Sequence, residues 1–223
     1  MKPLSRNAMA WRAAQDLYEG MYVNLGIGVP VMVPPYIPAG REVILHSENG
    51  MLGFTGLGKD EVVDPDLVNA AKEPVRLLPG GVFFDHATSF TMIRGGHIDV
   101  ALLGAFEVSE RGDIANWTVD DPGRAPGVGG AMDLAVGARE VRVIMEHTTR
   151  EGEPRLRKTC RYPLTAAGVV KRIYTSLAVL DVADGVLVVR EILEGMTFDD
   201  IVQRTEAALR LAPDCRPLRT PIA

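Results

Sequence analysis

The chain contains little cysteine, few aromatic residues and no long apolar run, and each shortage narrows what the protein can be. Cys160 and Cys215 are its only cysteines in 223 residues, too few for a disulfide-rich scaffold, and they form no CxxC motif. We therefore expect reduced thiols in a cytoplasmic protein. No apolar run approaches the ~18 residues that a membrane helix needs, and the N-terminus lacks the apolar core of a signal peptide, so we also expect a soluble chain.

An excess of positive charge and the spacings of common metal and dinucleotide sites are missing as well. The formal net charge is -5, which gives no electrostatic reason to bind nucleic acid or an anionic membrane. The segment GIGVPV at 26–31 falls short of a dinucleotide-binding GxGxxG because a valine replaces the last glycine. The histidines show no HExxH or comparable spacing, so a metal hydrolase is kept only as an alternative hypothesis and no metal ligand is assigned. They are His46, His86, His97 and His147.

What the chain does contain is aliphatic residues, arranged as short apolar runs. Hydrophobic residues make up 47% of the sequence, which is enough to bury a sizeable core. Runs such as 41–47, 98–106 and 140–146 read as buried strands and alternate with short helices. The predicted fold is α/β, an open and mostly parallel sheet with helices on both faces, plus antiparallel C-terminal strands. We predict a single domain over residues 1–223, with an irregular tail from about residue 211.

Capping residues and glycines predict where several elements begin and end. Ser5 is placed to cap a helix that runs to about Tyr18, and Asp85 to cap one that runs through Ile93. Thr197 and Asp200 mark the start of a helix in TFDDIVQRTEAAL. The glycine-rich and then acidic stretch at 50–73 is predicted to be loop and short turns.

A carboxylate and an amide follow the apolar run at 41–47, where Ser47, Glu48 and Asn49 precede Gly50. In an open α/β sheet, ligands bind outside the carboxyl ends of the strands, and Glu48 falls at that edge. Glycine lets backbone N–H groups approach a ligand, so Glu48 is a candidate base, ligand or nucleophile. The alternative is an ordinary solvated glutamate in a turn. The glycines near neighbouring strand ends are Gly26, Gly28, Gly80, Gly81, Gly104, Gly129 and Gly130.

The segment SENGMLG at 47–53 is similar to the Ser-Glu-Asn-Gly signature of family I coenzyme A-transferases, in their β subunit or β half. The resemblance continues in order along the chain and covers about residues 5–210. It is closest to the subgroup that acts on 3-oxo acids, acetoacetate or 3-oxoadipate. The other similar segments are YVNLGIGVP (22–30), VDPDLVNAAKEPV (63–75), SFTMIRGGHIDVALLGAFEVSERGDIANW (89–117), GVGGAMDLAVGA (127–138), VIMEHT (143–148), PLT (163–165) and LAVLDV (177–182).

The resemblance implies a role for each candidate site residue. Glu48 is the nucleophile, which carries CoA as a glutamyl thioester with ping-pong kinetics, and the Gly130 amide donates a hydrogen bond to the oxyanion. Asn49 holds the Glu48 loop or is a plain turn residue. Lys72 either contacts CoA or is a solvated surface lysine. The full set of implied substrate and CoA-binding residues is Asn24, Gly26, Gly28, Asn49, Lys72 and Gly129.

The resemblance also implies what the chain needs besides itself. Coenzyme A thioesters are substrates, with no permanently bound cofactor, and an α subunit is expected, as an α₂β₂ assembly. Acetoacetate is the predicted acid, with succinyl-CoA or acetyl-CoA as donor, and 3-oxoadipate is the alternative. The segments 51–56 and 120–127 depart from the family pattern and leave the acid preference open. A non-catalytic effector-binding or assembly protein on the same fold is the competing hypothesis.

Overall fold

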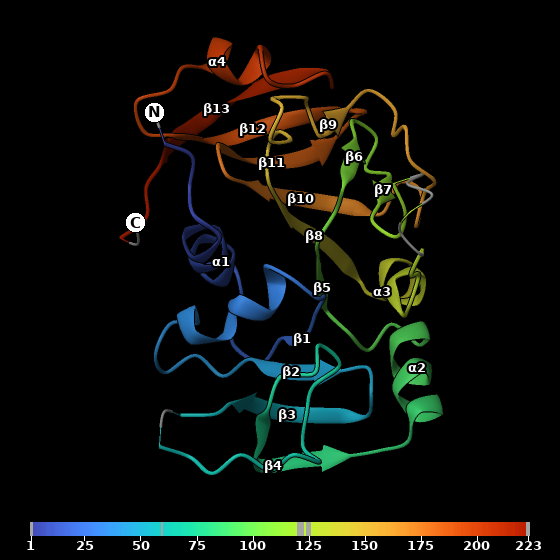
Figure 1. Ribbon diagram of the computed structural model, residues 1–223. Coiled ribbons are helices and arrows are strands. Elements are labelled where there is room, and N and C mark those ends of the chain that lie inside the picture. The colour runs from blue at the N-terminus through green and yellow to red at the C-terminus, as the bar shows by residue number, and fades with distance from the viewer. Residues whose placement is uncertain (1, 59, 120–122, 124–125, 222–223) are drawn as a thin grey trace.

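The computed structural model describes residues 2–58, 60–119, 123 and 126–221, and a ten-stranded sheet runs through it (Figure 1). The strands follow the order β13-β12-β11-β10-β8-β5-β1-β2-β3-β4. They are β1 (Tyr22–Leu25), β2 (Ile44–Ser47), β3 (Met51–Gly56), β4 (Val75–Phe83), β5 (Val100–Leu103), β8 (Glu140–Met145), β10 (Val170–Thr175), β11 (Ala178–Ala183), β12 (Val186–Leu193) and β13 (Leu209–Leu218).

The middle of this sheet is parallel and its two ends contain antiparallel pairs. Strands β10, β8, β5, β1 and β2 are parallel neighbours. Antiparallel pairing adds β3 and β4 beyond β2, and β11 and β12 beyond β10, before β13 returns parallel to β12. A separate small sheet is formed by β7 (Ile114–Ala115), β6 (Glu107–Ser109) and β9 (Leu156–Arg157). The predicted α/β class, with a parallel sheet and antiparallel C-terminal strands, is confirmed.

Helices cover both faces of the sheet, and their starts follow the capping residues. Ser5 Oγ accepts a hydrogen bond from the Ala8 amide at 3.2 Å, and Asp85 Oδ1 accepts one from the Thr88 amide at 2.9 Å. Thr197 forms the predicted capping box. The helices are α1 (Arg6–Ala14), α2 (His86–Arg94), α3 (Ala131–Gly137) and α4 (Phe198–Val202), with 3₁₀ turns η1 (Pro30–Met32) and η2 (Pro34–Tyr36). No helix in the described ranges is long and apolar enough to cross a membrane.

Strand β5 shows how the two faces are built. Val100 and Leu102 pack into the core that also contains the buried side of α1. Ala101 and Leu103 pack into the opposite core, together with Ile93 of α2. All four strand residues are buried, as expected for a parallel strand covered on both faces. The sheet therefore separates an α1 face from an α2/α3 face, and the position of a side chain along a strand decides which face it reaches.

Two predictions about the C-terminal region were wrong. The predicted irregular tail from about residue 211 belongs instead to β13, an edge strand that buries Ala212 and Leu218. Pro213 and Pro217 hid this strand, yet an edge strand tolerates proline because one side of it needs no ladder partner. The helix expected in TFDDIVQRTEAAL is also shorter, since α4 ends at Val202.

Two further strands were missed or misjudged. The stretch predicted as loop from residue 50 begins with β3, which forms a hairpin with β2 through the pair Ser47 and Met51. Its glycines concealed the strand, because glycine is rare in regular strands. Strand β4 also runs past Gly80 and Gly81 instead of ending there. This hairpin matters for function because its turn contains Glu48.

Candidate active site

Glu48 lies in the turn that joins β2 to β3, and Gly50 holds that turn in shape. Gly50 has a φ of 119°, which side chains rarely adopt, and its amide donates to Ser47 O at 3.0 Å. Its own carbonyl accepts from the Phe84 amide at 3.0 Å. A Cβ at this position would collide with the carbonyl oxygen of Phe84. The glycine of the signature is therefore needed for the close approach of two backbone segments.

We predict that Gly50→Ala destabilises the protein by about 2–4 kcal/mol, from the strained φ together with the collision at Phe84. Gly152→Ala is the matched control, because Gly152 also has a positive φ, 88°, but no heavy atom near its missing Cβ. Chemical denaturation should show a clearly larger loss in the free energy of unfolding for Gly50→Ala. Equal losses for the two variants would show that the contact with Phe84 has no cost.

The neighbours of Glu48 in the signature are tied to the segment that follows β3. Ser47 Oγ accepts a hydrogen bond from the Ala70 amide at 2.9 Å, and Asn49 Nδ2 donates to Val68 O at 2.8 Å. Both contacts lead away from the Glu48 carboxylate. The structure thus places Asn49 as an anchor of the loop, and its side-chain amide bonds to the chain itself.

The Glu48 side chain is half-buried and points to the opposite side. Asn24 Nδ2 donates a hydrogen bond to Glu48 Oε2 at 3.2 Å. The backbone of Gly130, which directly precedes α3, comes so close that a Cβ there would lie 3.7 Å from Glu48 Cγ and 3.1 Å from Phe90 Cζ. Of the candidate residues, Glu48, Asn24 and Gly130 are therefore brought together, and the sequence separates them by many residues.

Glu48 opens onto a pocket of about 600 Å³ between α2 and α3, which lie side by side (Figure 1). The ring of His86 packs against Phe90, with ring centroids 4.6 Å apart. Arg94 Nε donates to Asp133 Oδ1 at 2.6 Å across the two helices. The lining residues are Glu48, His86, Ala87, Phe90, Thr91, Arg94, Gly129, Gly130 and Asp133.

A buried polar network lies beneath Glu48, and the sequence analysis did not predict it. Asn24 Nδ2 is 3.0 Å from His46 Nδ1, and His46 Nε2 is 3.1 Å from Ser89 Oγ. All three side chains are almost completely buried. Burial lowers the pKa of His46 to about 4, so its imidazole is neutral at physiological pH. The available signal was alternation, since His46 lies two residues before Glu48 and on the same face of the strand.

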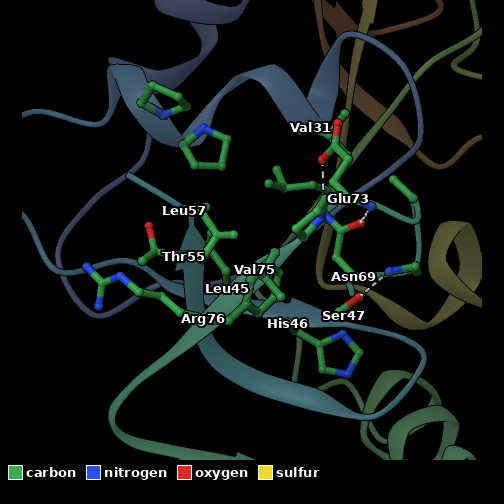
Figure 2. A pocket seen from close by; sticks show the side chains of 18 of the residues that line it. Val31, Leu45, His46, Ser47, Thr55, Leu57, Asn69, Glu73, Val75 and Arg76 are labelled. Atoms are coloured by element: carbon green, nitrogen blue, oxygen red, sulfur yellow. Dashed lines mark hydrogen bonds between the residues drawn. The ribbon is translucent and has the colours of Figure 1, made fainter. Parts of the chain in front are cut away.

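A second pocket, of about 400 Å³, lies on the other side of β2 (Figure 2). Figure 2 shows Ser47 bonded toward this side, whereas the imidazole of His46 points away from it. Asn69 and Glu73, which line the pocket, bracket the turn that contains Lys72. Lys72 is exposed, has a φ of 64°, and is not among the described residues that line the Glu48 pocket.

The glycines after β1 serve the backbone and do not line the Glu48 pocket. The Gly26 amide donates to Leu102 O at 2.8 Å, and a Cβ on Gly26 would lie 3.1 Å from that oxygen. Gly26 thus allows β1 to pack closely against the end of β5. Gly28 has a φ of 106° and open space around it. Gly129, by contrast, lines the pocket beside Gly130.

Other candidate chemistries find no support among these side chains. Within the described ranges, no group of three or more His, Cys, Asp or Glu side chains is arranged to hold a metal ion. Burial raises the pKa of the Cys160 thiol to about 12, so it is not a nucleophile at neutral pH. Most of the divergent segment 120–127 lies outside the described residues. The arrangement at Glu48 suits nucleophilic or acid–base chemistry by a carboxylate at the sheet edge.

An α/β sheet with a glutamate at the carboxyl end of a parallel strand, facing bare glycine backbone, defines a carboxylate-dependent α/β enzyme. Residues 6–204 match the coenzyme A transferase family. The chain is 54% identical over 200 residues to one of the subunits of the 3-oxoadipate CoA-transferase of Pseudomonas putida, covering 90% of this chain and 93% of that one. It is 48% identical over 204 residues to a subunit of the probable succinyl-CoA:3-ketoacid coenzyme A transferase of Bacillus subtilis, covering 91% and 94%. The protein therefore belongs to the coenzyme A transferase family, as a chain of the β-subunit type.

A solved structure has the same fold at low sequence identity. The acyl-CoA transferase YdiF of Escherichia coli O157:H7 aligns with a TM-score of 0.76 and 19% identity. The alignment covers 97% of this chain but only 44% of the YdiF chain, so the present chain spans less than half of that polypeptide. At this identity the likeness shows the fold alone.

Proposed function

We propose that the chain is the glutamate-bearing β subunit of a 3-oxoacid CoA-transferase, which moves CoA between succinyl-CoA or acetyl-CoA and a 3-oxo acid. The observation that carries this proposal is the Glu48 carboxylate, which is held by the Asn24 amide, lies against the Gly130 backbone and opens onto a pocket. A CoA carrier needs a carboxylate, because a serine or cysteine nucleophile would keep the acyl group and release CoA.

The reaction proceeds in two balanced halves at this one side chain. A Glu48 oxygen attacks the acyl-CoA thioester, which gives a mixed anhydride and releases the CoA thiolate. The thiolate then attacks the glutamyl carbonyl, so that the first acid leaves as its carboxylate and CoA stays on Glu48 as a thioester. The second acid attacks this thioester to give a new anhydride and thiolate. Attack of the thiolate on the new acyl carbonyl forms the product and restores Glu48.

The residues around Glu48 have separate tasks in this scheme. Asn24 holds one carboxylate oxygen, which leaves the other to attack. Each addition places negative charge on a carbonyl oxygen, and the Gly130 amide is the proposed donor to it, worth about 2.7–4 kcal/mol in the transition state. Remote contacts with the large CoA molecule press the thioester onto Glu48, and Lys72 is the proposed contact there.

Acetoacetate is the proposed 3-oxo acid, and a specific observation favours 3-oxoadipate as the second candidate. The identity to the P. putida 3-oxoadipate enzyme is 54%, against 48% for the B. subtilis 3-ketoacid enzyme. Comparison of kcat/KM for the two acids with the same CoA donor would decide between them.

We also infer an α subunit, in an α₂β₂ complex, that completes the site. Both relatives are named as one subunit of their enzyme, and the YdiF chain is more than twice as long as the part aligned here. Ile27 after β1 and Val136 on α3 are each 72% exposed and are available to be covered by a partner. Acetyl-CoA, succinyl-CoA and 3-oxoacyl-CoA are bound only as substrates.

The test is an intact-mass measurement on the native complex. Incubation with acetoacetyl-CoA or succinyl-CoA, in the absence of an acceptor acid, should add the mass of CoA less one water to this chain. Peptide mapping should locate the adduct at Glu48, and an acceptor acid should remove it. Tight CoA binding without any adduct or exchange would instead support the non-catalytic effector-binding hypothesis. Full activity of this chain without any partner would contradict the inferred α subunit.

A further inference from the structure

We propose that His46 and Ser89 are positioning residues that orient the Asn24 amide, so that its Nδ2 and not its Oδ1 faces the Glu48 carboxylate. The inference rests on the proposed function, because it concerns how the nucleophile is held. Neither side chain touches the Glu48 carboxylate, so each acts through Asn24 alone.

The amide of Asn24 has two orientations of nearly equal shape, and only one suits Glu48. In the observed one, Nδ2 faces three acceptors: His46 Nδ1 at 3.0 Å, His46 O at 3.2 Å and Glu48 Oε2 at 3.2 Å. Asn24 Oδ1 is buried and has no hydrogen-bond partner among the described residues. In the flipped orientation, Oδ1 would face Glu48 Oε2, and two acceptors would repel each other. The contacts on Nδ2 therefore decide the orientation.

His46 can favour the observed orientation only in one tautomer. Its Nδ1 must accept from Asn24, so its proton must lie on Nε2. Ser89 Oγ, 3.1 Å from Nε2, is placed to receive that proton's hydrogen bond. If the proton moved to Nδ1, the imidazole would donate toward Asn24 and would favour the flipped amide. Ser89 thus selects the tautomer, and the tautomer selects the amide orientation.

The surroundings keep this network rigid and dry. Asn24 and Ser89 are 0% exposed and His46 is 1% exposed, so bulk water does not compete for their hydrogen bonds. The Phe84 ring stacks on the imidazole at 6.0 Å between centroids and 13° between planes. Asn24 lies on β1, His46 on β2 and Ser89 on α2, so three elements fix one amide.

The predicted consequence falls on the chemical step. A flipped Asn24 pushes the carboxylate away from its attacking position, while the surfaces that bind CoA stay unchanged. His46→Leu should therefore lower kcat and the rate of glutamyl-CoA formation by about tenfold, with KM for acyl-CoA within about twofold. His46→Gln should restore kcat to within about threefold, because one glutamine amide can accept from Asn24 and donate to Ser89.

The matched control is His147→Leu in the same native complex. His147 is equally buried and also has two side-chain contacts, Thr175 Oγ1 at 2.8 Å and Thr205 Oγ1 at 3.0 Å. It lies outside the Asn24 network. This variant should lower the thermal midpoint about as much as His46→Leu but leave kcat unchanged.

The outcomes separate this inference from the proposed function. A wild-type complex without a CoA adduct refutes the proposed function itself. With wild-type adduct present, the inference is overturned if His46→Leu keeps wild-type kcat, if His147→Leu lowers kcat equally, or if a folded His46→Gln is as slow as His46→Leu. Should His46→Leu fail to fold, Ser89→Ala decides. A fall in kcat of about threefold at unchanged KM supports the inference, and an unchanged kcat overturns it.

Discussion

Replacing Glu48 with alanine is expected to abolish CoA transfer, with kcat falling by at least about 10⁴-fold in the native complex. The reason is that every step of the proposed cycle forms or breaks a bond to a Glu48 oxygen or to its carboxyl carbon. The Gly130 backbone and the rest of the CoA site remain, so binding of acyl-CoA should change little. Steady-state kinetics together with the intact-mass assay would measure both effects.

Three comparisons sharpen this expectation. Glu48→Gln keeps the shape and a partner for Asn24 but lacks a carboxylate, so it should be about as inactive as alanine. Glu48→Asp keeps the carboxylate but withdraws it by one methylene, and it should retain a small, measurable rate. Glu151→Ala changes an exposed glutamate of a distant turn and should behave as wild type. A Glu48→Ala complex that transfers CoA within tenfold of the wild-type rate would end the proposal.

Local rules predicted much of the fold because several elements depend on residues close in sequence. Ser5, Asp85 and Thr197 cap the helices expected of them, each through a side chain that reaches an amide three residues on. The central strands were readable as apolar runs because they are buried on both faces. Strand β13 was not, since its place depends on pairing with β12, which only the assembled sheet supplies.

The same division applies to the site. Glu48 stood out because its signature is contiguous, and Gly130 because a double glycine precedes a short helix. Asn24 was placed in the set by resemblance, but its contact with Glu48 comes from the parallel register of β1 and β2, where Asn24 lies beside His46. The partners of His46 come from another strand and from α2, so no local pattern reveals them. Lys72 shows the reverse case, where a recognisable segment lies outside the described lining of the Glu48 pocket.

The stability of the protein should fall steeply as the pH is lowered from 7 to 5, because two histidines are buried in their neutral form. Burial lowers the pKa of His46 to about 4, and burial with the nearby charge of Arg204 does the same for His147. In the unfolded chain their pKa returns to about 6.5, so between these values the unfolded state binds protons that the folded state does not. Protons therefore favour unfolding, and the free energy of unfolding should drop by about 2 kcal/mol per histidine, about 4 in all.

The window from pH 7 to 5 isolates this effect from the carboxylates. Burial raises the pKa of Asp16 and Glu191, but the hydrogen bonds from Arg12 outweigh it and hold both pKa values below their ordinary 3.8 and 4.5. Their contribution is therefore lost only at more acidic pH. Chemical denaturation at pH 7, 6 and 5 should show the decline, and His147→Leu should halve its slope because one of the two titrating groups is gone. A free energy of unfolding that stays flat over this range would mean that the buried imidazoles accept protons as readily in the folded protein as in water.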